Sequence, residues 1–103
     1  MKTTIVIFRM DREGIVFALF PEIPADNHGV FCTCFQHVGQ HCAADYLGCI
    51  AASRPATSAE YADLESELRQ RGYDLAIRQR ASYSMRQRRQ QMATDVLETE
   101  EIR

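Results

Sequence analysis

Two short runs of β-branched and aromatic residues open the chain, and the brief connection between them constrains the fold most strongly. Residues 3–10 and 15–20 are rich in strand-forming side chains, and the first run is apolar on both faces. The sequence Asp11-Arg12-Glu13-Gly14 separates them, and Gly14 can adopt the positive φ that a tight turn requires. So short a connection predicts an antiparallel hairpin.

Proline and glycine mark the ends of the next segments. Pro21 is expected to end the second strand, because proline cannot donate a hydrogen bond to a ladder. Residues 21–29 are then expected to form a surface loop. A third strand is predicted over residues 30–38, with Gly39 breaking it. Over residues 42–52 the apolar spacing favours a short helix, and a strand remains an alternative there.

The clearest helix signal lies in the middle of the chain. Thr57 and Glu60 have the spacing of a capping box, in which each side chain accepts a hydrogen bond from the other residue's backbone N–H. An apolar stripe follows, and Gly72 stands where a helix would end. The sequence therefore predicts a helix over residues 58–71.

Two further elements are expected towards the C-terminus. Residues 73–78 alternate apolar and polar side chains, which predicts a strand that pairs at an edge of the sheet or between the hairpin and the third strand. Strong helix formers fill residues 84–97, with Ser84 and Gln87 as a second capping box. The apolar stripe of this helix is thin, so it is expected to dock weakly, to fray or to pair with another copy.

These elements together predict an α+β fold. We expect a small, mostly antiparallel sheet of three to four strands with a packed helix, in the order β-β-β-α-α-β-α. A chain of 103 residues has room for one compact domain. We place that domain at residues 1–80, followed over residues 81–103 by an arginine-rich helix and an acidic tail.

Hydropathy along the chain indicates the compartment. The apolar run near the start is only four residues long before Arg9 interrupts it, which is not typical of a secretory signal. No window approaches the ~20 apolar residues of a membrane span. We therefore expect a cytoplasmic protein with no membrane partner, in which the four cysteines are reduced thiols.

The segment from His28 to Cys49 contains ligand types that zinc prefers, although their spacing is poor. Cys32 and Cys34 would lie on one face of the third strand, and no second Cys-x-x-Cys pair accompanies them. Cys42 could gain a lowered pKa at a helix N-terminus beside a histidine, but adjacency does not aim an imidazole at the sulfur. The favoured interpretation is that the cysteines are small buried apolar residues.

A corner of the chain offers a better candidate for chemistry. If a helix begins near His41, then His41 and Asp45 face the same way and His37 can approach them. Two imidazoles and a carboxylate could hold Zn²⁺ or another divalent metal, or act as an acid–base pair. The favoured alternative is that both histidines hydrogen-bond to backbone at a strand-to-helix corner, with no cofactor present.

Charge is distributed unevenly along the chain. Residues 69–94 carry seven arginines against one aspartate, whereas the net charge of the whole chain is −2. Such a block suggests an acidic partner, and nucleic-acid phosphates would bind it in a salt-dependent way. A solvated helix face is the favoured alternative. The nucleic-acid candidates are Arg78, Arg80, Arg86, Arg88 and Arg89.

Several short motifs resemble a family of small bacterial and phage proteins that carries no assigned activity. The motifs are Phe20-Pro21-Glu22-Ile23-Pro24, His37-Val38-Gly39-Gln40-His41, Ala44-Asp45-Tyr46, Arg54-Pro55-Ala56-Thr57 and Glu60-Tyr61-Ala62-Asp63-Leu64. The likeness covers about residues 3–80. It implies an origin in phage or other mobile DNA, and it places weight on His37, Gln40, His41, Asp45 and Tyr46 as a functional unit.

The leading hypothesis from the sequence is a small non-enzymatic interaction protein of a phage or mobile element. Its partner would be a host protein, such as a defence system, or a second copy of the chain in a homodimer. One alternative is a metal-dependent hydrolase using His37, His41 and Asp45. The other is non-specific binding of nucleic acid by the arginine-rich C-terminal helix.

Overall fold

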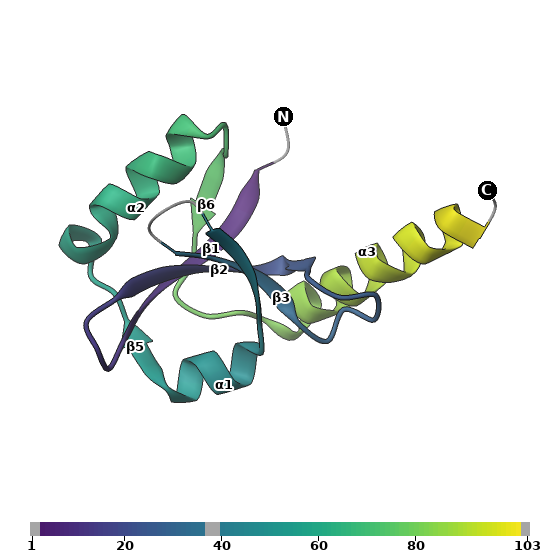
Figure 1. Cartoon of the computed structure of the whole chain (residues 1–103), viewed down its shortest axis with the longest axis horizontal. Helices are drawn as coiled ribbons and strands as arrows, with labels where there is room; N and C mark the ends of the chain where they lie inside the picture. The colour runs from purple at the N-terminus through teal and green to yellow at the C-terminus, as the bar shows by residue number, and fades with distance from the viewer. Residues whose placement is uncertain (1–2, 37–39, 102–103) are drawn as a thin grey trace.

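The computed structural model of the chain describes residues 3–36 and 40–101, and among these it describes the side chains of 3–36 and 43–97. The fold is α+β with a mostly antiparallel sheet (Figure 1). The elements of the described chain, in order, are β1 (Thr4–Asp11), β2 (Val16–Pro24), β3 (Cys32–Gln36), β4 (Gln40–Ala44), α1 (Tyr46–Ala51), β5 (Ser53–Pro55), α2 (Ser58–Gln70), β6 (Leu75–Ile77) and α3 (Tyr83–Glu101).

The sheet is built around β1. The strand order is β4-β3-β2-β1-β5, and β6 also pairs with β1. The predicted hairpin of β1 and β2 is confirmed, with Ile7 opposite Leu19, and Gly14 has the expected positive φ of 82°. On the other edge of β1, β6 runs parallel to its first half and β5 runs antiparallel to its second half. Both edges of β1 therefore carry partner strands.

The sheet has six strands, more than the three to four expected from the sequence. One added strand is β4, which lies where a helix over residues 42–52 was favoured. The helix there is shorter and begins only at Tyr46. Residues 40–44 pair with β3, with His41 opposite Phe35. Backbone hydrogen bonds to a neighbouring strand outweigh local helix spacing, which carries no information about that neighbour. The other added strand is the three-residue β5.

The prediction that Pro21 ends the second strand is wrong. β2 continues to Pro24, and the register against β3 shifts between Phe20 and Pro24. Because the ladder is irregular at this point, the missing N–H of Pro21 is tolerated there. Pro21 is instead among the most deeply buried residues of the sheet.

Both faces of the sheet are buried, which gives the molecule three layers (Figure 1). On one face Phe8, Phe20 and Phe35 pack against Leu64 and Leu68 of α2. On the other face an apolar cluster packs against α1 and the segment before α3; its buried members are Ile7, Phe17, Leu19, Cys32, Cys34 and Ala44. In β3, Cys32 and Cys34 lie on one face, as predicted, and Phe35 lies on the other.

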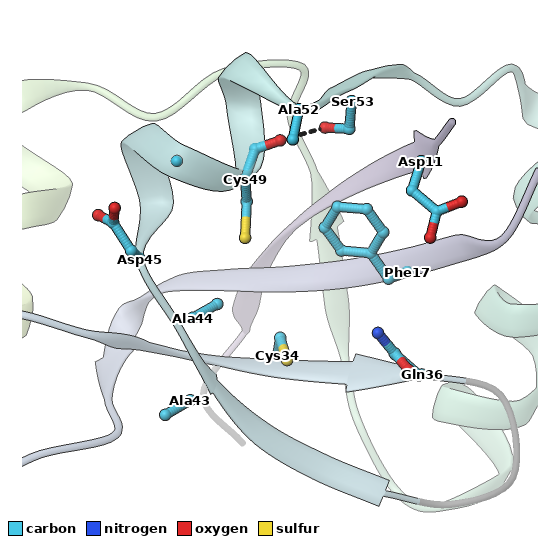
Figure 2. Close-up of a pocket in the computed structure, with 11 residues that line it drawn as sticks. Asp11, Phe17, Cys34, Gln36, Ala43, Ala44, Asp45, Cys49, Ala52 and Ser53 are labelled. Carbon is cyan, nitrogen blue, oxygen red and sulfur yellow. Dashed lines mark hydrogen bonds between the residues drawn. The ribbon is translucent and has the colours of Figure 1, made fainter. Parts of the chain in front are cut away.

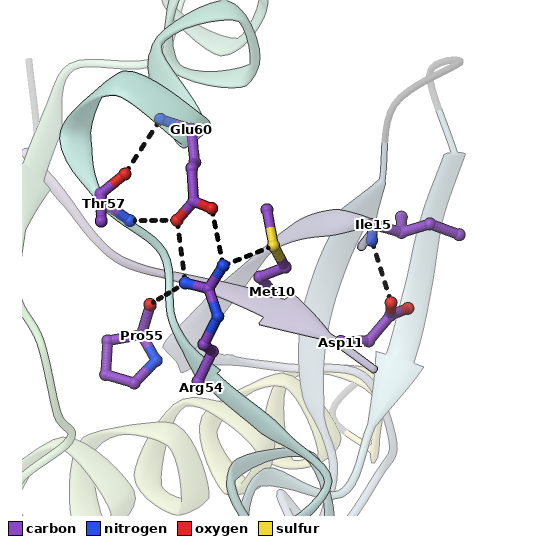
Figure 3. A network of polar contacts seen from close by, with 7 residues as sticks. All are labelled: Met10, Asp11, Ile15, Arg54, Pro55, Thr57 and Glu60. Atoms are coloured by element: carbon purple, nitrogen blue, oxygen red, sulfur yellow. Dashed lines mark hydrogen bonds and ion pairs between the residues drawn. The ribbon is translucent and has the colours of Figure 1, made fainter. Parts of the chain in front are cut away.

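Helix α2 begins with the predicted capping box. The Glu60 N–H donates to Thr57 Oγ1, and the Thr57 N–H donates to Glu60 Oε1 at 2.9 Å. The guanidinium of Arg54 adds two contacts to the same carboxylate, at 2.9 and 2.6 Å (Figure 3). The Arg54 hydrogen bond is the main cause that lowers the pKa of Glu60 to about 2. The helix ends at Gln70, and Gly72 has the positive φ of a helix end.

Helix α3 is longer than predicted and starts one residue earlier. The expected capping box of Ser84 and Gln87 does not form; Ser82 Oγ accepts a hydrogen bond from the Met85 N–H instead. The first half of α3 lies against β2, where Arg89 and Ala93 are buried. The Arg89 guanidinium donates to the carbonyls of Gly29 and Pro21, at 2.9 and 3.0 Å. The arginine-rich segment is thus docked on the sheet.

A second buried arginine joins α1 and β5 to the sheet. Arg9 lies on β1 and is only 6% exposed. Its guanidinium donates to the carbonyls of Ile50 and Ser53 and to Ser53 Oγ, at 3.0, 2.6 and 2.9 Å. A carbonyl at the end of a helix has no partner within the helix, so Arg9 supplies a donor that α1 lacks.

Replacing Arg9 by leucine should lower the free energy of unfolding by roughly 2–4 kcal/mol, because the buried carbonyls of Ile50 and Ser53 would lose charged donors. Urea unfolding followed by circular dichroism measures this. The control is Arg12→Leu, which removes an exposed arginine three residues away. Equal losses in the two variants would show that Arg9 carries no special role.

The Glu60 carboxylate should make stability depend on acid pH. Its pKa in the folded chain, about 2, lies below the ordinary 4.5, so its contribution is present above pH 4.5 and is lost as the pH falls towards 2. The difference in urea midpoint between the wild type and Glu60→Gln should therefore shrink over that range. The exposed Asp63→Asn variant on the same helix is the control. A difference that does not change with pH would contradict the assignment.

Candidate functional site

An open cavity of about 420 Å³ lies between α1 and the sheet (Figure 2). Apolar groups from Phe17, Ala44 and Cys49 form much of its lining. Asp45 and Asp11 lie at opposite ends of it in the view of Figure 2. The full lining is Asp11, Phe17, Cys34, Gln36, Ala43, Ala44, Asp45, Gly48, Cys49, Ala52 and Ser53. The cavity is thus an apolar hollow with polar groups around it.

Asp45 and Gly48 shape the α1 side of the cavity. Asp45 precedes the helix in an extended conformation, yet its side chain makes no capping hydrogen bond. The carboxylate folds back over Gly48 instead: a Cβ atom at position 48 would lie 2.8 Å from Asp45 Oδ2. Glycine at position 48 therefore permits the close approach of this carboxylate.

Tyr46 ties the cavity wall to the C-terminal part of the chain. Its hydroxyl accepts a hydrogen bond from the Ala81 N–H at 2.8 Å, and its ring packs on the same core cluster as Cys49 and Ile50. Tyr46 therefore holds α1 against the segment that leads into α3. Its position explains why an aromatic residue with a polar tip suits this point of the chain.

Two thiols of this face are poor nucleophiles at neutral pH. Burial raises the pKa of Cys32 to about 11. Burial, followed by the charge of Asp45, also raises the pKa of Cys49. In Figure 2 the Cys49 sulfur points from α1 towards the sheet. With these raised pKa values both thiols stay protonated at neutral pH. They are poor nucleophiles because the thiolate is the reactive form of cysteine.

The expectation that all the cysteines are reduced is wrong for Cys34, which is disulfide-bonded, whereas Cys32 and Cys49 are free. In the register of β3 and β4 the residue opposite Cys34 is Cys42. Cysteines at directly opposite positions of antiparallel strands are within the Cα separation that a disulfide spans. The prediction of a helix from residue 42 had concealed this opposition.

The corner predicted from the sequence is described in part. His37 lies outside the described residues, and so do the side chains of Gln40 and His41. The backbone of β4 places Gln40 opposite Gln36 and His41 opposite Phe35. Asp45 and Tyr46 both lie at the start of α1 as described above. Among the described residues, no three metal-ligating side chains group closely enough to hold a metal ion.

The five candidate arginines have different environments. Arg78, Arg80 and Arg86 are exposed. Arg88 is also exposed and forms an ion pair with Glu22, with 3.3 Å between Nη1 and Oε2. Arg89 is buried and bonds to backbone carbonyls. The structure therefore does not present all five on one open surface.

Comparisons of the chain with protein-family models, with curated proteins and with solved structures find no match. None of the described helices is long and apolar enough to cross a membrane.

Most of the residues that line the cavity are not predicted by the sequence. Asp11, Phe17 and Gln36 belong to three different strands, so no local motif joins them. One signal in the sequence did point to this side of the sheet. Strands β1, β2 and β3 carry apolar side chains on both faces, so a second layer must cover the face opposite α2. Residues 46–51 form part of that layer.

Alkylation under denaturing conditions tests the disulfide. Because the chain has four cysteines and one bridge uses two, iodoacetamide should modify two cysteines in urea without reductant and four after reduction. Intact mass spectrometry counts the adducts, and peptide mapping should locate the two early ones at Cys32 and Cys49. Four adducts without reductant, from protein prepared with no reducing agent, would show that no bridge forms.

Proposed function

We propose that this chain is a non-enzymatic binding protein that contacts a partner protein through the α1 cavity. The observation that carries the proposal is the cavity itself, an apolar hollow of about 420 Å³ with Gln36 and the two aspartates among its polar lining. Sites that accept a partner's side chain have this composition: an apolar floor supplies affinity, and a few polar groups supply orientation.

An exposed apolar side chain on the same helix favours a protein partner. Leu47 of α1 is 71% exposed, although leucine is among the residues most often buried. Leu47 is not among the residues that line the cavity, so it is a second apolar contact point on α1, outside the hollow. A partner that inserts one side chain into the cavity and also covers Leu47 contacts more of α1 than a small ligand in the cavity does.

The sequence resemblance to small phage and bacterial proteins supports a host protein as that partner. A component of a host defence system is one instance of such a partner. Of the corner residues predicted from the sequence, Asp45 lines the cavity. Asp45 belongs to one of the motifs that carry the resemblance, so the resemblance and the cavity share this residue.

Capture from host lysate with matched variants tests the proposal. Ala52→Trp should fill the cavity and Leu47→Asp should remove the apolar contact, so each should lose the proteins that the wild type captures, by about tenfold or more. The control is Ala62→Trp, a change of the same size at an exposed position of α2. Circular dichroism should show the same fold for all variants. Equal capture by the wild type and both cavity variants would overturn the proposal.

Metal analysis separates the proposal from the hydrolase alternative. Protein purified without a histidine tag should contain less than stoichiometric divalent metal. One metal ion per chain that is lost in His37→Ala and His41→Ala would favour the hydrolase and contradict a purely non-enzymatic role.

A further inference from the structure

The α1 cavity combines an apolar floor with negative charge at its ends. Asp11 and Asp45 lie at opposite ends of the hollow in Figure 2, and its described lining contains no arginine, lysine or histidine. The ion pairs of the described chain involve neither aspartate. Arg12 and Arg54 line a neighbouring hollow, where Arg54 is paired with Glu60. A group that enters the cavity therefore meets two carboxylates and no positive side chain of its described lining.

The carboxylate of Asp45 is open to a ligand. The residue is exposed, and its side chain makes no capping hydrogen bond to α1. It approaches Gly48 more closely than a larger residue at position 48 would allow. Burial is the main cause that raises the pKa of Cys49, and the charge of Asp45 is the second. The negative charge of Asp45 therefore acts on groups inside the cavity.

The carboxylate of Asp11 is held in place by backbone at the other end of the cavity. Its Oδ1 atom accepts hydrogen bonds from the N–H groups of Glu13 and Ile15, both at 2.9 Å, and Figure 3 shows the bond to Ile15. These bonds use one oxygen, which leaves Oδ2 for another donor. Asp11 is thus a positioned acceptor, and hydrogen bonds from charged donors to carboxylates are stronger than those between neutral groups.

We propose that the side chain which the partner inserts into the α1 cavity is a basic one, an arginine or a lysine. Its aliphatic stem lies on the apolar floor around Phe17 and Cys49, and its charged end donates to Asp11 or Asp45. Arginine and lysine both combine an apolar stem with a charged tip, which matches the arrangement of this cavity. The inference rests on the proposed function, because it names the chemistry of the group that enters the same cavity.

Charge favours a basic side chain over an acidic or an apolar one. An acidic side chain would bring a third carboxylate near Asp11 and Asp45, and like charges repel. An apolar side chain matches the floor, but a partner that closes over the cavity would then remove water from both carboxylates without giving them a donor. A guanidinium offers paired donors that fit a carboxylate, and an ammonium offers three.

Titration of the full chain with short peptides tests this chemistry directly. The probes are blocked, glycine-rich pentapeptides with arginine, lysine, norleucine or glutamate at the centre, and amide chemical shifts measured by NMR report binding. The arginine and lysine peptides should shift the amides of Asp45, Gly48 and Cys49, with a Kd in roughly the millimolar range expected for one side chain. The norleucine peptide should bind about tenfold more weakly, and the glutamate peptide more weakly still.

Neutral variants of the two aspartates show whether their charge is responsible. Asp11→Asn and Asp45→Asn nearly preserve side-chain shape, and asparagine keeps an oxygen that can accept the backbone bonds at position 11. Each change should raise the Kd of the arginine peptide by about threefold, and the double variant should raise it by about tenfold. The control is Asp63→Asn, an exposed aspartate of α2, which should leave the Kd unchanged.

Two results of the titration would overturn the inference. One is a norleucine peptide that binds as tightly as the basic peptides, and the other is the absence of any shift with either basic peptide. A Kd for arginine that is the same in the wild type and the double variant would also contradict it.

The lysate capture separates this inference from the proposed function. Loss of capture both in Ala52→Trp and in the double variant Asp11→Asn/Asp45→Asn supports the two together. Loss in Ala52→Trp with full capture by the double variant supports a binding cavity but overturns a basic side chain as its occupant. Full capture by Ala52→Trp, Leu47→Asp and the double variant overturns the proposed function and this inference with it.

Discussion

The guanidinium of Arg9 joins the parts of this protein that matter most for its candidate site. It lies on the central strand β1 and donates to the carbonyls of Ile50 and Ser53. These bonds hold α1 and β5 against the sheet, and the space left between α1 and the strands is the cavity. A buried positive charge is stable there because carbonyl dipoles at the end of a helix point towards it. The fold and the cavity therefore depend on the same hydrogen bonds.

Arg89 is a second buried arginine that donates to backbone carbonyls. Its bonds to Gly29 and Pro21 dock the first half of α3, and the backbone of Gln90 lies so close to Gly29 that a Cβ there would be 2.7 Å from its Cα. Glycine at position 29, with φ 70°, permits both the turn and the contact. The anchor also fixes where α3 leaves the body, and hence which half of the helix remains uncovered.

The parts of the fold predicted well are those with local causes. The capping box of Thr57 and Glu60 specifies the start of α2 within a few residues, and the turn ending at Gly14 specifies the first hairpin. The parts predicted poorly depend on distant partners. Residues 40–44 form a strand because β3 lies beside them, and β2 passes Pro21 because the ladder shifts there. Local propensity contains neither fact, so the disulfide at Cys34 was missed as well.

The α+β class, the hairpin, helix α2 and the alternation of β3 follow from local features of the sequence, namely turn chemistry, capping and side-chain period. The role of Arg9 and Arg89 as buried anchors comes from the packing of the whole chain, because in the sequence both are ordinary charges. The same packing brings Asp11, Phe17, Gln36 and Asp45 around one cavity. The physical reason is that burial and carbonyl partners come from residues far away in the chain, which no local pattern records.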